Sequence, residues 1–198
     1  MSETVLGLMT ALGLSTAAGL NAYLPLLIVG ALDRWTEVLT LDAPYDTLGE
    51  PQVMIAIGVI ALVDLVGDKI PAIDSVLHAV GVVIAPVAGA LVALAATGSD
   101  TVDPAFAIVL GVAAAGATHG ARSMVRPAST AFTGGAGNPL LSLGEDAVST
   151  ILSVGAVLVP IVAFVMALLL LGLLWWGVSR MWRRRRAGRG RAFSRNQR

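Results

Sequence analysis

The sequence predicts an all-α protein, a polytopic transmembrane helix bundle with five to six crossings. Three observations lead to this fold class. Hydrophobic residues make up 56% of the 198 residues and charged residues 13%, whereas soluble domains have about 45–50% and about 25%. The mean hydropathy is +0.82. Long apolar stretches recur along the chain, and nine of the 13 basic residues lie between Arg180 and Arg198.

The apolar stretches define the expected helices. A membrane-spanning helix needs about 20 mainly apolar residues. Suitable segments occupy residues 5–32, 53–66, 76–96, 104–124 and 148–178. The first is interrupted by Asn21 and Pro25, and the last has 31 residues without a charge, so as one helix it must tilt or project.

The number of crossings is expected to follow from the charges. Residues 33–51 carry a net charge of −4, and their shortage of basic residues favours the side away from the cytoplasm. Five crossings with a cytoplasmic C-terminus would bring this stretch into the cytoplasm. Six crossings keep both termini cytoplasmic and the acidic stretch outside. We therefore favour six, provided that residues 127–145 cross as a short, broken segment.

A weak internal repeat supports two halves, residues 5–97 and 104–178. Residues 80–87 (VGVVIAPV) match 154–161 (VGAVLVPI), and residues 21–25 match 123–127 more weakly, in the same order. Two halves of three crossings each would form an inverted-topology repeat, an architecture common among transporters. Chance alignment of Val, Gly and Pro in apolar helices is the alternative.

The basic residues form a C-terminal tail. Residues 1–179 are the expected transmembrane domain and residues 180–198 a basic cytoplasmic tail. Arginines directly after an apolar helix with Trp175 and Trp176 are explained by the membrane interface and anionic lipids, and we expect no nucleic-acid partner. The chain is expected to be integral to the cytoplasmic (plasma) membrane.

Charged residues inside the membrane are the candidate functional residues, because each costs at least about 2.5–3.5 kcal/mol and needs a partner, a cavity or a function. The first group is Asp64, Asp68, Lys69 and Asp74. Asp64 and Asp68 are one helical turn apart, which suits a cation or proton site. A polar turn between two helices is the alternative, favoured for Lys69 and Asp74.

The second group is His119, Arg122 and Arg126, whose spacing places all three on one helix face. Two arginines on one stripe attract a carboxylate, a phosphate or an internal acidic residue. Their alternative role is to extend to the lipid headgroups, and the histidine alone is more typical of a packed, hydrogen-bonded residue.

The third group lies in a stretch rich in Gly, Ser, Thr and Pro, residues 129–139, which contains Asn138 and is followed by Glu145 and Asp146. Glycine and proline disfavour a continuous helix. Unwound backbone at membrane depth presents amides and carbonyls to ions and substrates. An exposed loop is the alternative.

The sequence contains no motif typical of a common enzyme or metal site. The chain has no cysteine, which excludes disulfides, thiol catalysis and cysteine-ligated zinc. It lacks a Gly-Lys-Ser/Thr phosphate loop, a His-Glu-x-x-His motif and a Gly-x-Ser-x-Gly motif. No close-spaced ligand motif accompanies His78 or His119. We expect no enzymatic activity, no metal and no cofactor.

Three motifs resemble a known family: AAGLNAYLPLL at residues 17–27, DKIP at 68–71 and HGARS at 119–123. Over residues 5–172 the chain is similar to bacterial membrane proteins catalogued as "domain of unknown function 4126". The resemblance implies a helical membrane architecture and no particular activity. Similar sequences often carry a basic residue near the position of Asn21, and this chain departs from that pattern.

The leading hypothesis is a small membrane transport protein whose broken helices around Asn21, Tyr23 and Pro25 meet residues 122–138. Arg122 and Arg126 would hold an anionic group or an internal carboxylate. Four acidic residues would take part in ion or proton coupling: Asp64, Asp68, Glu145 and Asp146. The substrate is a small ion, a small solute or a lipid headgroup, and the small size of one chain favours a homodimer.

Two other functions fit the same residues. A structural or assembly module would use its buried charges as static ion pairs, such as Arg122 with Asp64. A membrane enzyme acting on a phosphorylated lipid is compatible with His119, Arg122 and Arg126. It ranks last, because the sequence shows no recognisable nucleophile.

Overall fold

The computed structural model describes residues 2–67, 71–134 and 137–195, and within them the chain is entirely helical, without a strand. Helices include 89% of the residues, which confirms the predicted all-α class. The elements are α1 (Glu3–Leu20), α2 (Tyr23–Trp35), η1 (Tyr45–Gly49), α3 (Pro51–Gly67), α4 (Pro71–Thr101), α5 (Pro104–Thr133), α6 (Asn138–Leu158) and α7 (Pro160–Arg195).

Among the described residues, five helical stretches are long and apolar enough to cross a membrane: Glu3–Leu20, Ala79–Gly98, Pro104–Met124, Asn138–Leu158 and Pro160–Arg180. The helix α3 is equally apolar but has only 17 residues. This set of apolar helices confirms a membrane-embedded helical bundle.

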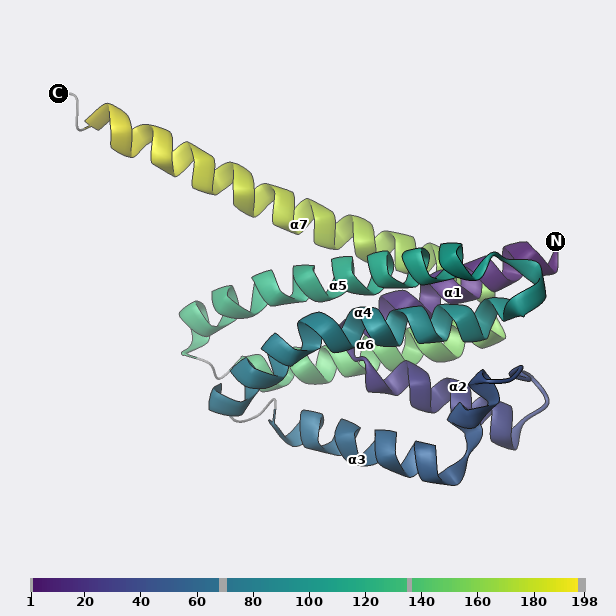
Figure 1. Cartoon of the computed structure of the whole chain (residues 1–198). Coiled ribbons are helices and arrows are strands. Elements are labelled where there is room, and N and C mark those ends of the chain that lie inside the picture. Colours follow the sequence, from purple (N-terminus) through teal and green to yellow (C-terminus); the bar gives the residue numbers. More distant parts are fainter. Residues whose placement is uncertain (1, 68–70, 135–136, 196–198) are drawn as a thin grey trace.

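The first apolar segment is a hairpin and not a single interrupted helix. The chain leaves helical geometry at Asn21 (φ −142°, ψ 116°) and begins α2 two residues later. Figure 1 shows that α2 turns back, so that its C-terminal end lies at the same end of the bundle as the N-terminus. Pro25 explains the break, because in a continuous helix its ring would clash with the carbonyl group of Asn21, four residues earlier.

The last apolar segment is also divided. The helix α6 ends at Leu158, and α7 begins at Pro160, a residue that is well suited to the first turn of a helix. The expected crossing by residues 127–145 is wrong. Residues 127–133 complete α5 and residues 138–145 begin α6, with Gly134 in the left-handed conformation (φ 62°) as the C-cap of α5.

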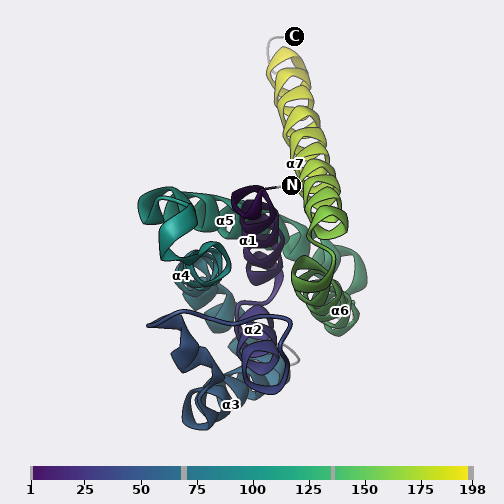
Figure 2. The same cartoon turned by 90° about the vertical axis from the view of Figure 1, so that its right-hand side faces the viewer.

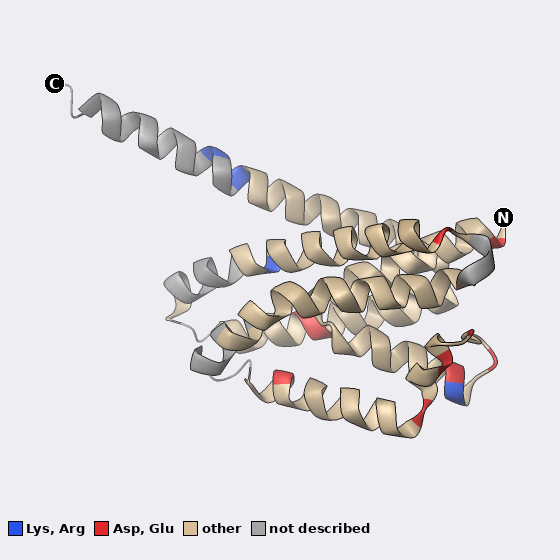
Figure 3. Cartoon of the chain, in the orientation of Figure 1, with Lys and Arg blue, Asp and Glu red and all other residues tan. Residues whose placement is uncertain are grey.

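These breaks change the predicted topology. The start of α1, η1 and the α4–α5 and α6–α7 connections lie at one end of the bundle, and α7 ends at the other (Figure 1). The acidic residues between positions 33 and 50 lie at the end of the bundle where α1 begins (Figure 3). The six-crossing prediction placed both ends of the chain on one side, whereas α1 begins and α7 ends at opposite ends of the bundle. The α1–α2 hairpin returns the acidic stretch to the end at which α1 begins.

The positions matched in the internal repeat adopt different local structures. The helix breaks at residues 21–25, whereas α5 continues through residues 123–127. Likewise, Pro86 lies inside α4, whereas Pro160 begins α7. The inverted repeat stays a prediction from the sequence.

The helix α1 occupies the centre of the bundle, surrounded by α4, α5, α6 and α7 (Figure 2). Hydroxyl groups tie it to its neighbours: Thr10 Oγ1 donates to the carbonyl of Ala156 at 2.9 Å, and Ser15 Oγ donates to the carbonyl of Gly89 at 2.9 Å. Such bonds between membrane helices contribute on average about 0.6 kcal/mol each. The core around them consists mainly of alanine, which permits close helix packing.

Candidate functional site

The candidate site begins at the break between α1 and α2, where Asn21 caps the second helix. Its side-chain Oδ1 accepts hydrogen bonds from the backbone N–H groups of Tyr23 at 3.0 Å and Leu24 at 3.1 Å. These N–H groups belong to the first turn of α2 and have no partner within that helix. The side-chain oxygen of Asn21 therefore accepts the hydrogen bonds that backbone carbonyl groups would accept in an uninterrupted helix.

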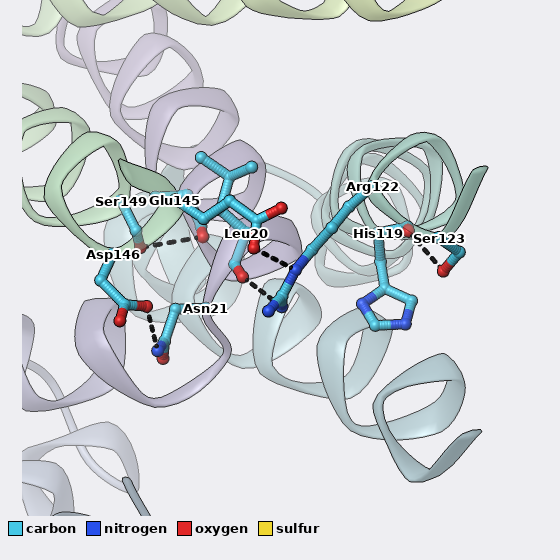
Figure 4. Close-up of polar contacts among 9 residues, drawn as sticks. Leu20, Asn21, His119, Arg122, Ser123, Glu145, Asp146 and Ser149 are labelled. Atoms are coloured by element: carbon cyan, nitrogen blue, oxygen red, sulfur yellow. Dashed lines mark hydrogen bonds and ion pairs between the residues drawn. The ribbon is translucent and has the colours of Figure 1, made fainter. Parts of the chain in front are cut away.

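Arg122 of α5 binds the other side of the break. Its Nε lies 2.6 Å from Oε2 of Glu145 on α6, and its Nη1 donates to the carbonyl of Leu20 at 2.6 Å (Figure 4). Leu20 is the last residue of α1, where the helix dipole places partial negative charge. The guanidinium thus lies between a carboxylate and the negative end of a helix.

Asp146 of α6 lies next to the positive end of the other half-helix. Asn21 Nδ2 donates to Asp146 Oδ1 at 2.9 Å, which holds this carboxylate near the N-terminus of α2. Ser149, one turn later on α6, donates to the carbonyl of Ala17 at 3.0 Å. The middle of α6 therefore supplies partners for both sides of the break, as Figure 4 shows.

A small polar cavity of about 30 Å³ adjoins the break. Four polar side chains line it: Tyr23, Asp64, His119 and Arg122. A cavity of this volume has room for about two water molecules. The site therefore combines titratable side chains with space for water.

The wall of the cavity is shaped by Gly81 of α4. A Cβ atom at this position would lie 2.6 Å from Cε1 of His119, so a larger residue would force the imidazole to shift, and His119 is only 5% exposed. The histidine is thus packed between α4 and α5 with its side chain at the cavity.

The structure brings together seven of the residues that the sequence indicated: Asn21, Tyr23, Asp64, His119, Arg122, Glu145 and Asp146. Asn138 begins α6, about 10 Å along the helix from Glu145, and is not part of this cluster. Asp68 and Lys69 lie outside the described residues, and so does the side chain of Arg126. The ion pair of Arg122 is with Glu145, whereas the sequence analysis suggested Asp64, which instead lines the cavity.

Three contributors to the site were not predicted: the carbonyl group of Leu20, Gly81 and Ser149. Ser149 carried a usable signal, because it follows Glu145 by four residues and therefore lies on the same face of one helix. The contributions of Leu20 and Gly81 come from the backbone and from a missing side chain, and residue type alone does not indicate them.

Of the four described charged side chains at the site, Arg122 is buried, whereas the carboxylates of Asp64, Glu145 and Asp146 are partly exposed. Glu145 forms the ion pair with Arg122, Asp64 lines the cavity, and Asp146 accepts a hydrogen bond from Asn21. In the described part of the chain, no three His, Cys, Asp or Glu side chains gather in a way that would hold a metal ion.

A comparison with known families matches residues 8–180 to the model described as "Domain of unknown function (DUF4126)". No curated protein and no solved structure matches the chain.

Proposed function

Because the chain belongs to the family described as "Domain of unknown function (DUF4126)", which names no activity, we propose a function from the site itself: a small membrane transport protein that carries a small cation through the bundle. One observation carries this proposal. The helix breaks between α1 and α2 beside a polar cavity, and the two half-helix ends lie near the charged side chains of Arg122 and Asp146.

Broken helices are a recurrent device in transporters, because half-helix ends offer partial charges to ions at membrane depth. Here the C-terminal end of α1 holds Arg122, and the N-terminal end of α2 lies near Asp146. Unwound backbone away from water is tolerated only where protein or a cavity satisfies it, and both are present at Asn21.

The balance of charge favours a cation over an anion. Asp64 places a carboxylate in the lining of the cavity, and Glu145 offsets the charge of the one described cation there, Arg122. A carboxylate in a cavity attracts cations. The volume of about 30 Å³ favours a small ion over a larger solute or a lipid headgroup.

The charge at the two ends supports an orientation with the arginine-rich tail in the cytoplasm. The tail carries nine basic residues, and the opposite end carries the acidic stretch. Short basic segments next to membrane helices favour the cytoplasmic side. Arg180, which lies 5.0 Å from the ring centroid of Trp176, is suited to the headgroup region, where tryptophan and arginine collect.

The test uses the absence of cysteine in the chain. Single cysteines are placed at Ala18, which lines the cavity, at Ser123, next to Arg122, and at Val165, an exposed residue of α7 that serves as the lipid-facing control. Intact cells and inverted vesicles are then treated with a membrane-impermeant thiol reagent. Labelling at positions 18 or 123, with 165 unlabelled, supports a water-filled path. Labelling at neither position argues against transport.

A static structural module is the second candidate, and one observation favours it. Arg122 is held by both Glu145 and the carbonyl of Leu20, an arrangement that also suits a fixed cross-link between helices. A double variant that exchanges the two charges, Arg122→Glu with Glu145→Arg, distinguishes the two functions. If the chain is a transport protein, the double variant folds but loses the cation current that the wild-type protein carries across a planar membrane. If the chain is a structural module, the double variant folds equally well, and neither the variant nor the wild-type protein carries a current.

A further inference from the structure

We propose that the transported or coupling cation is the proton, and that Asp64 of α3 and His119 of α5 pass it across the cavity. This inference rests on the proposed transport function and names its ion.

The geometry of the cavity carries the proposal. Asp64 and His119 reach it from two different helices, and both line a volume of about 30 Å³. Water molecules fit in this space, about two of them, and so are able to bridge the carboxylate and the imidazole. Tyr23 adds a hydroxyl group from α2, which is both a donor and an acceptor of hydrogen bonds.

The lining suits a proton better than a metal cation. Hard metal cations require a shell of about six oxygen ligands. The described residues provide no cluster of three acidic or histidine ligands, and the positively charged Arg122 forms part of the cavity wall. A proton needs only one acceptor at a time, and histidine is the side chain whose unperturbed charge change lies in the physiological pH range.

The transfer is balanced in charge. Asp64 in its acid form gives its proton to a water molecule in the cavity, and that water gives a proton to the imidazole of His119. The products are a carboxylate and an imidazolium, with no net change of charge in the cavity. Four other described titratable or charged groups lie near this pair. Tyr23 on α2 and Arg122 on α5 line the cavity, and on α6 Glu145 pairs with Arg122 while Asp146 accepts from Asn21. Glu145 compensates Arg122, so the guanidinium opposes the imidazolium only weakly.

The two residues differ in how closely they are packed. The helix α3 packs mainly against α2 and only slightly against α4. Asp64 therefore belongs to a less enclosed wall of the cavity, whereas His119 is packed against Gly81 in the interior.

The experiment uses the full chain in liposomes that contain a pH-sensitive dye and a high potassium concentration. Adding valinomycin makes the interior negative and draws protons inward. We expect wild-type protein to acidify the interior, and Asp64→Asn and His119→Gln each to reduce acidification to the rate of protein-free liposomes. Glu37→Gln, at an exposed carboxylate far along the chain from the cavity, is the matched control and should keep the wild-type rate.

Size-exclusion profiles and thermal unfolding establish that each variant is folded. If Asp64→Asn does not fold, Asp64→Glu replaces it, because it keeps the acid and should retain acidification. Wild-type uptake of radioactive sodium without acidification would overturn the proton assignment and leave cation transport standing. No flux of protons, sodium or potassium would overturn both. Wild-type acidification in folded Asp64→Asn and His119→Gln would overturn the role of these two residues.

Discussion

Arg122 Nε on α5 lies 2.6 Å from Glu145 Oε2 on α6, and the two side chains are only 9% and 16% exposed. These residues are 23 positions apart in the sequence and lie on separate helices. The same guanidinium also binds the end of α1, so one side chain links three helices at the break. The ion pair therefore contributes both to the charge of the site and to the stability of the bundle.

Removing one partner of this pair should destabilise the protein strongly. Glu145→Gln leaves the guanidinium without its compensating charge, and the expected loss is about 3–5 kcal/mol of unfolding free energy. Thermal unfolding of detergent-purified protein measures it. The double variant with Arg122→Gln should recover much of the loss, while Arg180→Gln, at an exposed position, should have little effect. Equal stability of Glu145→Gln and the wild type would contradict a structural role for the pair.

The cap at Asn21 leads to a prediction that depends on pH. Asn21→Ala should lower the stability by about 0.5–2 kcal/mol, because the first turn of α2 loses its acceptor. Asn21→Asp keeps a capping oxygen but places a second carboxylate against Asp146. Its stability should rise as the pH falls, because protonation removes the repulsion, and Asn21→Ala should not show this gain. Parallel pH profiles of the two variants would refute the geometry described for Asn21.

Close packing of α4 and α5 predicts opposite effects for two glycines on one helix. A Cβ atom at Gly111 would lie 2.7 Å from the Cα atom of Ala90, whereas a Cβ atom at Gly120 would meet nothing within 4 Å. Gly111→Ala should therefore destabilise the protein. Gly120→Ala should be neutral or stabilising, because alanine is favoured over glycine in helices by about 1 kcal/mol. Unfolding temperatures of the two variants provide the comparison, and similar shifts in both would argue against this helix contact.

The hairpin predicts on which side each end of the chain lies. Cysteines at Ser2 and Thr40 should both react with an impermeant thiol reagent in intact cells. A cysteine at Arg183 should react only in inverted vesicles. All three positions are exposed. A reaction of positions 2 and 183 from the same side would restore the six-crossing layout with both termini cytoplasmic.

Much of the site was visible in the sequence, because local spacing determines which residues share a helix face. His119 and Arg122, three residues apart, both reach the cavity as expected. The interruption at Asn21 and Pro25 was also visible, since proline removes a donor and excludes the carbonyl group four residues earlier. The partner of Arg122 was not, because Asp64, Glu145 and Asp146 were equally suitable carboxylates and only the packing of α6 selects among them.

The number of crossings was less predictable, because the sequence alone does not show where a proline breaks a helix. Residues 148–178 contain no charge, so nothing in their polarity marks the break at Pro160. At residues 127–133, by contrast, Pro, Ser and Thr suggested an unwound segment, yet α5 continues to Thr133. Proline ends one helix and is accommodated in another, and tertiary packing decides which occurs.

The central position of α1 has a consequence for the order of assembly. This helix is synthesised before α4 and α6, yet the carbonyl groups that accept from Thr10 and Ser15 belong to α6 and α4, and the carboxylate that binds Asn21 belongs to α6. None of these partners exists when α1 leaves the ribosome. Until α4 and α6 have been made, the polar groups of α1 must be satisfied within the helix, by water or by the insertion machinery, and α1 is enclosed only after α6 has been completed.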